Sequence, residues 1–363
     1  MKYIFLLFLL LPVVGQVYLS WQIWNILPLS TPFKILIVIL IALPFFTFFF
    51  SMSGQPDKLP MPLATALYEV GTAWFIILLY LVMLFLLLNL GTALHLIPSS
   101  FTHCSIIGSL SVLISMCAIF TYANIHYNNK KKVEITLTTE KKISRPMKLV
   151  LISDMHLGYH NKRSDLHHWI KLINKENPDA VLIAGDIIDR SIRPILEEHI
   201  SEEFKNFNAP VYAVYGNHDY YAGITSDRKF CENAGIHILQ DSIAYLGDLA
   251  IVGRDDKTNP QRKSLSEVIQ NVNRLKYIIE LDHQPYHLEE AEQNKVDFEF
   301  AGHTHYGQVW PLSWITDAIY EKAFGPYQRG NTYYYVSSGL GIWGAKFRIG
   351  TQSEYIVATI KQN

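Results

Sequence analysis

The sequence predicts an α/β domain that follows about four membrane-spanning helices. The first part of the chain is almost uncharged and strongly apolar, and a charged part begins near Asn128. In the charged part, short apolar runs typical of buried strands alternate with stretches of helical periodicity. Several of these runs end in Asp, Asn or His, and open α/β sheets place their sites at that end of the strands.

The apolar runs in the first part are long enough, or nearly so, to cross a bilayer, which needs roughly 20 residues. They are Tyr3 to about Ile26, Ile35 to Phe50 with flanking Thr31 to Phe33, about Thr72 to Ile97, and Ile106 to about Ile125. The first run could instead be a cleaved signal peptide, but the others would still hold the protein in the membrane. Almost no charge interrupts the runs, and Glu69 lies at a boundary. We therefore interpret them as an anchor and not as a transporter.

The charges after the last apolar run predict the orientation of the anchor. Positive residues within about 20 residues of a span set its topology. Here they are Lys130, Lys131, Lys132, Lys141, Lys142 and Arg145. These residues place the end of the last span on the cytoplasmic side, and four spans bring the start of the chain, with Lys2, to the same side. Both termini are therefore expected in the cytoplasm. We divide the chain into an anchor over residues 1–127, a basic linker with the first strand over 128–146, and a folded domain over 147–363.

Charge and cysteine content narrow the classes of function. The formal net charge of −1 argues against a nucleic-acid partner, which needs clustered Lys and Arg. Cys104, Cys117 and Cys231 suggest no disulfide framework. No feature of the sequence indicates an obligate protein partner.

The elements after the anchor follow from apolar runs and helical patterns. Strands that end in candidate site residues are expected at Met147–Ile152, Ala180–Ala184, Pro210–Tyr215, Tyr277–Leu281 and Val296–Phe300. Further strands are expected at Val133–Thr138, Ile236–Leu239, Ser242–Leu246, Leu249–Val252, Thr332–Val336 and Glu354–Thr359. Helices are expected at Ser164–Ile173 and Pro194–Phe207.

The ends of these strands carry side chains that ligate metals. The motifs are Asp154-x-His156, Gly185-Asp186-x-x-Asp189, Gly216-Asn217-His218-Asp219, Asp282-His283-x-Pro285 and Gly302-His303-x-His305. Carboxylate and amide oxygens together with imidazole nitrogens suit divalent manganese, iron or zinc better than a thiolate-bound structural zinc. Because the ligands are too many for one tetrahedral ion, we expect two divalent ions bridged by a carboxylate.

These motifs, in this order and rough spacing, resemble those of the calcineurin-like metallophosphoesterases over about Lys148 to Thr359. The resemblance implies a four-layer α/β/β/α sandwich. The Gly-His-Thr-His-x-Gly-Gln segment and Ser337 to Gly341 also look like the membrane-associated bacterial phosphodiesterase branch, which includes enzymes of the UDP-2,3-diacylglucosamine pyrophosphatase type. Tyr306 departs from that branch, which often has Gly there, and its ring could narrow the mouth of the site or touch the substrate.

The resemblance also implies a role for each site residue. One ion would be held by Asp154, His156 and His305. The second would be held by Asn217, His283 and His303, with Asp186 bridging the two. His218 would face the phosphate and stabilise developing charge or protonate the leaving oxygen, with Asp219 orienting its ring. Asp189 would be structural or support the ligands, and His160 is a minor candidate for such support.

Together these observations indicate a membrane-anchored phosphohydrolase in the bacterial inner membrane, with its catalytic domain in the cytoplasm. A metal-bound hydroxide would attack a phosphodiester or pyrophosphate in line. Anchoring favours a lipid-linked substrate. The alternatives are a phosphate-containing small molecule such as a soluble nucleotide diester, and a non-catalytic membrane receptor or scaffold.

The last part of the chain is rich in aromatic residues. They are Tyr306, Trp310, Trp314, Tyr320, Phe324, Tyr327 and Trp343. Such rings either cap the core of a sheet or rest on a bilayer surface.

Overall fold

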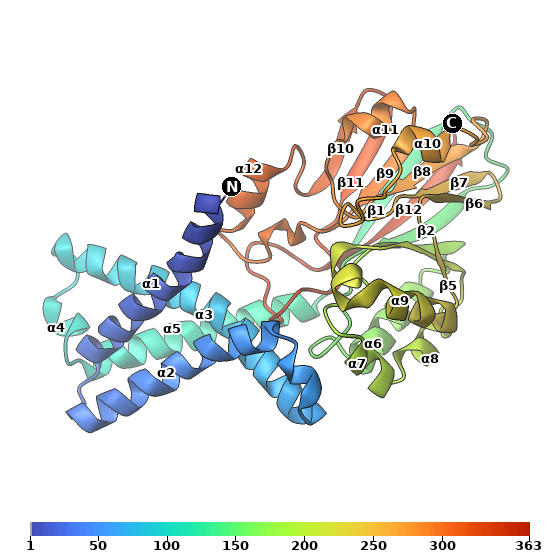
Figure 1. The fold of residues 1–363 in the computed structure, drawn as a ribbon. Helices are drawn as coiled ribbons and strands as arrows, with labels where there is room; N and C mark the ends of the chain where they lie inside the picture. The colour runs from blue at the N-terminus through green and yellow to red at the C-terminus, as the bar shows by residue number, and fades with distance from the viewer. Residues whose placement is uncertain (1) are drawn as a thin grey trace. The chain divides into compact units, whose positions relative to one another are not determined.

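The computed structural model describes residues 2–363, with side chains described from residue 10 onward. The chain divides into two compact units, Met1–Ile125 and His126–Asn363. Each unit is described by itself below, with the element labels of Figure 1.

The first unit is helical. Its elements are α1 (Lys2–Ile26), α2 (Thr31–Met52), the 3₁₀ turn η1 (Gln55–Lys58), α3 (Met61–Ala93), the short α4 (Ser99–Thr102) and α5 (Ile106–Asn128), whose last residues belong to the second unit. Pro residues at the first turns of α2 and α3 suit helix starts, where an amide N–H has no helical partner. For this reason α3 begins at Met61, well before the expected start near Thr72, and Glu69 lies inside the helix.

Three helices among the described residues, α2, α3 and α5, are long and apolar enough to cross a membrane. The expectation of about four spans is therefore one more than the described residues show. The remaining run, from Tyr3 to about Ile26, forms α1, but its side chains up to residue 9 lie outside the described residues.

Polar side chains within the first unit bond to one another, as expected where lipid offers no partners. The Trp74 indole N–H donates to Gln16 at 2.8 Å, and the Asn89 amide donates to the Tyr18 hydroxyl at 2.8 Å. Close packing of α2 and α3 depends on Gly71, because a Cβ there would lie 2.6 Å from the backbone nitrogen of Phe48. These contacts describe a packed helical unit.

The second unit contains two six-stranded sheets. The first has the order β1 (Lys131–Thr139), β12 (Glu354–Gln362), β2 (Met147–Ile152), β3 (Ala180–Ala184), β4 (Val211–Val214) and β5 (Ile236–Ile238). The second has the order β10 (Gly325–Arg329), β11 (Thr332–Val336), β9 (Phe298–Ala301), β8 (Tyr277–Leu281), β7 (Leu249–Gly253) and β6 (Ser242–Leu246). The central strands run parallel, from β2 to β5 in one sheet and from β7 through β8 and β9 to β11 in the other.

Side-chain alternation along the strands builds the layers. In β2, Leu149 and Leu151 enter the core between the two sheets, whereas Val150 and Ile152 face the opposite side. That opposite side is covered by α6 (Arg163–Asn174), α7 (Ile192–Glu197), α8 (Ile200–Phe204) and α9 (Asn217–Ala234). The outer face of the second sheet is covered by α10 (Leu265–Ile269) and α11 (Glu289–Gln293). Figure 1 shows these helices on opposite sides of the paired sheets, which confirms the expected four-layer α/β/β/α fold.

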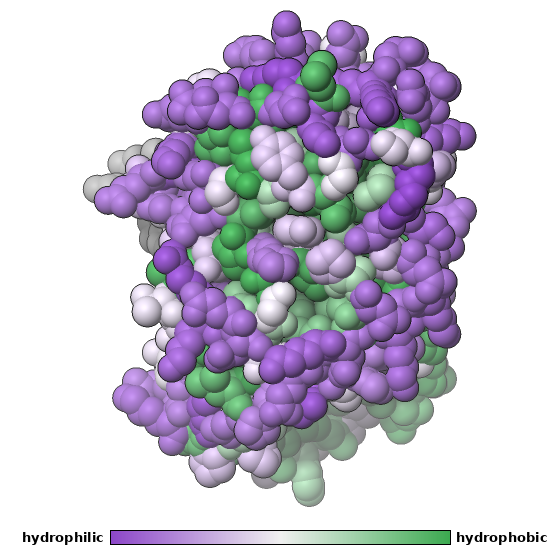
Figure 2. All heavy atoms as spheres, turned by 90° about the vertical axis from the view of Figure 1, so that its right-hand side faces the viewer, coloured by the Kyte–Doolittle hydropathy of each residue, from purple (hydrophilic) through white to green (hydrophobic). Residues whose placement is uncertain are grey.

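One face of the second unit, the side where β5 and β6 lie in Figure 1, is seen in Figure 2. Hydrophilic side chains cover most of this face, and hydrophobic ones gather in its middle. The surface agrees with the change in composition near Asn128, where the charged part of the chain begins.

Among the elements that differ from the sequence predictions are one helix and the linker. The expected helix Pro194–Phe207 is broken into α7 and α8 by His199, which has a left-handed backbone with φ 52°. The break turns the chain so that Ile195 and Ile200 both reach the same core. The basic linker expected from residue 128 onward is short, because α5 continues to Asn128 and β1 begins at Lys131. Within the second unit, the buried Tyr127 hydroxyl donates to Asn161 at 2.8 Å, which fixes the last turn of α5.

Candidate metal centre

The candidate ligands come from loops that directly follow parallel strands of both sheets. The loops after β2, β3 and β4 supply residues of the first sheet, and the loops after β8 and β9 supply those of the second. Several of these residues turn sharply with a left-handed backbone, at a cost of about 1–2 kcal/mol each. They are Asp154, His156, Asp186, His303 and His305, with φ between 45° and 70°. Strain of this kind is typical of functional loops that a surrounding fold holds in place.

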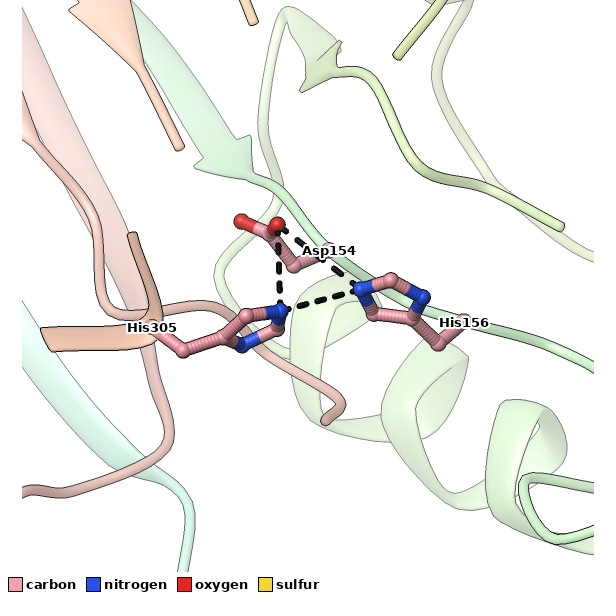
Figure 3. Close-up of side chains that lie close together, drawn as sticks. All are labelled: Asp154, His156 and His305. Atoms are coloured by element: carbon pink, nitrogen blue, oxygen red, sulfur yellow. Dashed lines mark hydrogen bonds and ion pairs between the residues drawn. The ribbon is translucent and has the colours of Figure 1, made fainter. Parts of the chain in front are cut away.

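The first group of donors joins Asp154, His156 and His305 (Figure 3). The Nε2 atoms of the two imidazoles are 3.0 Å apart, and His305 Nε2 lies 3.5 Å from Asp154 Oδ1. His156 Nε2 is 3.9 Å from the same carboxylate oxygen. Nitrogen and oxygen donors thus converge on one point, as ligands of a single ion do.

The second group joins Asp186, His283 and His303, and Asn217 lies beside it. His283 Nε2 is 3.1 Å from Asp186 Oδ2 and 3.2 Å from Asn217 Oδ1. The other ring nitrogen of His283 lies 2.8 Å from the carbonyl oxygen of Ala184. If Nδ1 carries the proton and donates to that carbonyl, the lone pair of Nε2 points into the group.

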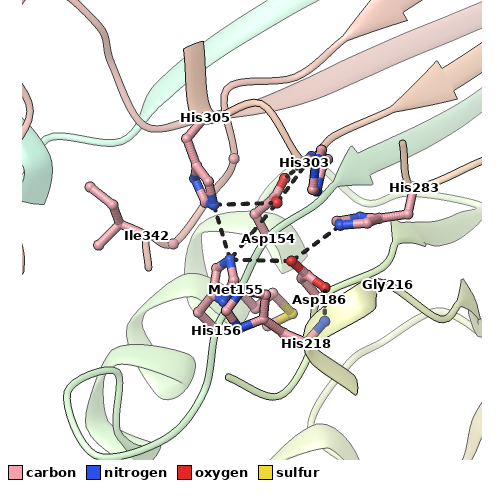
Figure 4. A network of polar contacts seen from close by, with 12 residues as sticks. Asp154, Met155, His156, Asp186, Gly216, His218, His283, His303, His305 and Ile342 are labelled. Carbon is pink, nitrogen blue, oxygen red and sulfur yellow. Dashed lines mark hydrogen bonds and ion pairs between the residues drawn. The ribbon is translucent and has the colours of Figure 1, made fainter. Parts of the chain in front are cut away.

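Asp186 lies between the two groups (Figure 4). Its Oδ2 is 3.1 Å from His283 Nε2 and 3.5 Å from His156 Nε2. The backbone N–H of His303 also donates to both oxygens of Asp154 at 3.1 Å, so each group contacts a residue of the other. The position of Asp186, within reach of imidazoles from both groups, is the placement required of a bridging carboxylate.

The electrostatics of the site also fit divalent cations. Burial would raise the pKa of Asp186, but the neighbouring His283 and other imidazoles outweigh it and hold that pKa well below its ordinary value. Burial lowers the pKa of His303 to about 4 and that of His305 well below its ordinary value. Asp186 is thus an ionised carboxylate and His303 and His305 are neutral imidazoles, which are the metal-binding forms of these side chains. Burial raises the pKa of Asp154; burial would lower the pKa of His283, but Asp186 and other carboxylates raise it well above its ordinary value.

His218 lies at the edge of both groups, and Asp189 faces its ring. His218 Nδ1 is 3.1 Å from Asp189 Oδ1 and 2.8 Å from the Asp189 carbonyl oxygen. The backbone N–H of His218 donates to Asp186 Oδ1 at 2.9 Å. Burial would lower the pKa of His218, but Asp186 and Asp189 raise it to about 9. The ring is therefore a cation near neutral pH, and 19% of its side chain is exposed.

The expectation that Asp219 orients the His218 ring is wrong. The Asp219 carboxylate accepts the backbone N–H of Ile188 at 2.9 Å and that of Gly216 at 2.7 Å. It thus joins the loop after β3 to the first turn of α9. Asp189, which was expected to be structural or to support the ligands, lies against the ring instead. Its Oδ1 also lies 3.4 Å from Nδ1 of the predicted ligand His156, which agrees with a supporting place.

Two supporting residues were missed in the sequence. Asn161 donates to the carbonyl oxygens of Met155 at 3.0 Å and His156 at 3.2 Å. Arg348 is fully buried and donates to the carbonyl oxygens of His305 at 2.6 Å and Gly341 at 3.2 Å. No local pattern marks Arg348, because its partner His305 lies 43 residues away along the chain.

Two minor expectations have different outcomes. His160 is buried, and its Nε2 lies 2.6 Å from the carbonyl oxygen of Ile342, which agrees with a supporting place beside the site. Tyr306 stacks on Phe324 at 4.9 Å, and its hydroxyl donates to Asp317 at 3.2 Å. These contacts turn the Tyr306 ring towards α12 (Ser313–Ile319).

Comparison with known proteins places this site in a family. Residues 147–307 match the family model described as calcineurin-like phosphoesterase. An uncharacterized metallophosphoesterase of Campylobacter jejuni is 31% identical over 265 residues, which cover 69% of this chain and 68% of that relative. A second, from Helicobacter pylori, is 30% identical over 240 residues, and the match spans only 62% of its length. A transmembrane protein with metallophosphoesterase domain from Danio rerio is 28% identical over 64% of this chain and 57% of its own. The chain therefore belongs to the calcineurin-like phosphoesterase family.

Proposed function

We propose that the chain is a membrane-anchored, two-metal phosphohydrolase that cleaves a phosphodiester or a pyrophosphate. The observation that carries this proposal is the convergence of two donor groups, from loops of both sheets, that meet at Asp186 Oδ2. Asp154, His156 and His305 would hold one ion, and Asn217, His283 and His303 would hold the other. When bound, paired divalent ions such as manganese, iron or zinc polarise a phosphoryl group and lower the pKa of bound water.

The protein's own residues would orient the substrate and handle charge. His218 is cationic, partly exposed and fixed by Asp189, so it can contact a phosphoryl oxygen at the mouth of the site. From there it would stabilise the charge that develops in the transition state, or donate a proton to the leaving oxygen. Asp186 accepts a hydrogen bond from the backbone N–H of His218 and so fixes this residue relative to the donor groups.

The anchor gives the proposal its location and its preferred substrate. The basic residues after α5 favour the inner membrane of a bacterium, with the domain over 147–363 in the cytoplasm. Residues 1–127 would be the anchor and 128–146 the linker with the first strand. A substrate whose phosphate is linked to a lipid, as in UDP-diacylglucosamine, suits an enzyme that stays at a membrane.

Aromatic rings beside His218 support a second candidate substrate, a soluble nucleotide diester. The His218 ring lies 5.4 Å from Tyr221 and 6.5 Å from Trp343, measured between ring centroids. Exposed aromatic faces can stack on a nucleobase. Such stacking would place the nucleoside on the His218 side of the phosphate.

Hydrolysis of bis-p-nitrophenyl phosphate by the full-length protein in detergent tests the proposal. We expect turnover that depends on added manganese, iron or zinc and falls sharply in His218→Ala and Asn217→Ala. The matched control is His237→Ala, because His237 is exposed on β5 away from the donor groups. Metal-loaded protein with no turnover above these site variants would contradict the proposal.

A further inference from the structure

The helix α12 carries an exposed apolar face beside the metal centre. Trp314 is 65% exposed, and Trp310, Ile315 and Ile319 are exposed as well. The Trp310 and Trp314 rings meet edge to face with their centroids 5.4 Å apart. We call these four side chains the α12 face. Their exposure excludes the simple alternative that these tryptophans cap the core of a sheet.

Charge is nearly absent from the segment that carries the α12 face. Between Gln308 and Tyr320 the only charged residue in the sequence is Asp317, which accepts a hydrogen bond from the Tyr306 hydroxyl. A contiguous exposed patch of Trp and Ile without charge is typical of a surface that binds another apolar phase. Trp in particular favours the boundary between headgroups and acyl chains.

Both ends of this segment lie near predicted metal ligands. Gln308 follows His305 closely, and the left-handed Gly307 between them lets the chain fold back, because a Cβ there would lie 2.4 Å from the carbonyl carbon of Leu312. The segment ends at Tyr320, whose ring lies 6.2 Å from that of His303 and whose hydroxyl accepts from Tyr286 at 3.1 Å. The segment that carries the α12 face therefore leads from one predicted ligand, His305, to the neighbourhood of another, His303.

The loop after β2, which carries Asp154 and His156, is called the metal loop. Hydrogen bonds link it to the end of α5, a helix that is long and apolar enough to span a membrane. The apolar run of α5 ends at about Ile125. Two residues later, the hydroxyl of the buried Tyr127 donates a hydrogen bond to Asn161. Asn161 in turn donates to the backbone of Met155 and His156, which belong to the metal loop. The last turn of α5 is thus linked to the backbone of a predicted metal ligand through the side chains of Tyr127 and Asn161.

We propose that the α12 face enters the headgroup region of the bilayer in which the protein is anchored and presents membrane-lipid phosphate to the metal centre. The occupant of this face is the bilayer, because α5 is long and apolar enough to span one and its last turn bonds, through Tyr127 and Asn161, to the loop that carries His156. Delivery of lipid phosphate to the metal centre rests on the phosphohydrolase function proposed above. Contact between the α12 face and the bilayer is independent of that function.

A fluorescent label tests the bilayer contact in the full chain. The exposed Cys104 and Cys117 are replaced by Ala, the buried Cys231 is kept, and an environment-sensitive dye is attached to the Trp314→Cys variant in proteoliposomes. The matched position is Leu275→Cys, because Leu275 is 81% exposed and precedes β8, whose opposite end carries His283. Nitroxide groups on the lipid chains should quench the dye at position 314 and leave the dye at position 275 nearly unquenched.

Equal quenching at both positions would overturn the inference. Disulfide crosslinking between two copies of the Trp314→Cys variant would also overturn it and would assign the α12 face to a second copy of the chain.

Two chromogenic diesters then separate substrate delivery from catalysis. Phosphatidyl-p-nitrophenol in vesicles and soluble bis-p-nitrophenyl phosphate release the same product. The variant Trp314→Ser, Ile315→Ser, Ile319→Ser should lose about tenfold in activity on the lipid and stay within about twofold on the soluble diester. Leu275→Ser should change neither rate.

An equal loss on both substrates, or on neither, would refute substrate delivery by α12. Absence of all hydrolysis by the unmodified protein would instead refute the phosphohydrolase function. In that case the dye experiment still decides whether the α12 face contacts lipid.

Discussion

Replacement of Asp189 by Asn should lower catalysis, whereas replacement of Asp219 by Asn should lower stability. Asp189 contacts the catalytic candidate His218 at 3.1 Å, and a hydrogen bond to a charged group contributes about 1.5–3 kcal/mol. Loss of that amount in the transition state corresponds to a fall of about 10–100-fold in kcat. Asp219→Asn keeps one acceptor oxygen, so one of the amides of Gly216 and Ile188 loses its partner, at about 1–3 kcal/mol of folding stability.

Steady-state rates with bis-p-nitrophenyl phosphate and thermal unfolding in detergent measure the two effects on each variant. The metal content of both proteins is measured as well, because Asp189 also lies 3.4 Å from His156. Since Asp189 helps to raise the pKa of His218, activity that needs the imidazolium should be lost at a lower pH in Asp189→Asn. The reasoning fails if Asp219→Asn loses activity at unchanged stability while Asp189→Asn keeps full activity with its metals bound.

Three further predictions concern the rest of the molecule. Burial raises the pKa of Glu280 to about 7 against the opposing effect of Arg254, so the folded state resists ionisation of this carboxyl. Stability should therefore fall as pH rises from about 4.5 to about 7, and denaturant titrations should show a flatter pH dependence in Glu280→Gln. Removal of metal by EDTA should lower the melting temperature and abolish turnover, because the buried carboxylates lose their counter-charge, and added manganese should restore both. Gly71→Val should destabilise the helical unit in detergent, because its Cβ would meet the backbone of α2 at 2.6 Å, whereas Gly15→Ala has ordinary contacts of 3.5 Å and should not.

Much of the fold was predictable because its causes are local. Buried parallel strands are continuous apolar runs, and β2 and β3 match their predicted ranges Met147–Ile152 and Ala180–Ala184. The candidate ligands were found for the same reason, since each follows such a run closely. The layers themselves followed from resemblance and not from periodicity, because both faces of β2 are apolar and give no indication of what covers them.

The parts that were not predicted depend on distant contacts. Asp189 and Asp219 each lie shortly after a glycine that follows a strand, and only the meeting of the β3 and β4 loops decides which one faces His218. Arg348 acts on His305 from far along the chain. The break at His199 arises because two short helices must reach one core, which helical periodicity alone does not show.

Electron paramagnetic resonance of the manganese-loaded, full-length protein tests the central claim most directly. If two ions share the Asp186 carboxylate, the spectrum should show an exchange-coupled manganese pair, and Asp186→Ala should convert it to isolated ions or none. Loaded protein that shows only isolated manganese, or a coupled pair that survives in Asp186→Ala, would contradict the account.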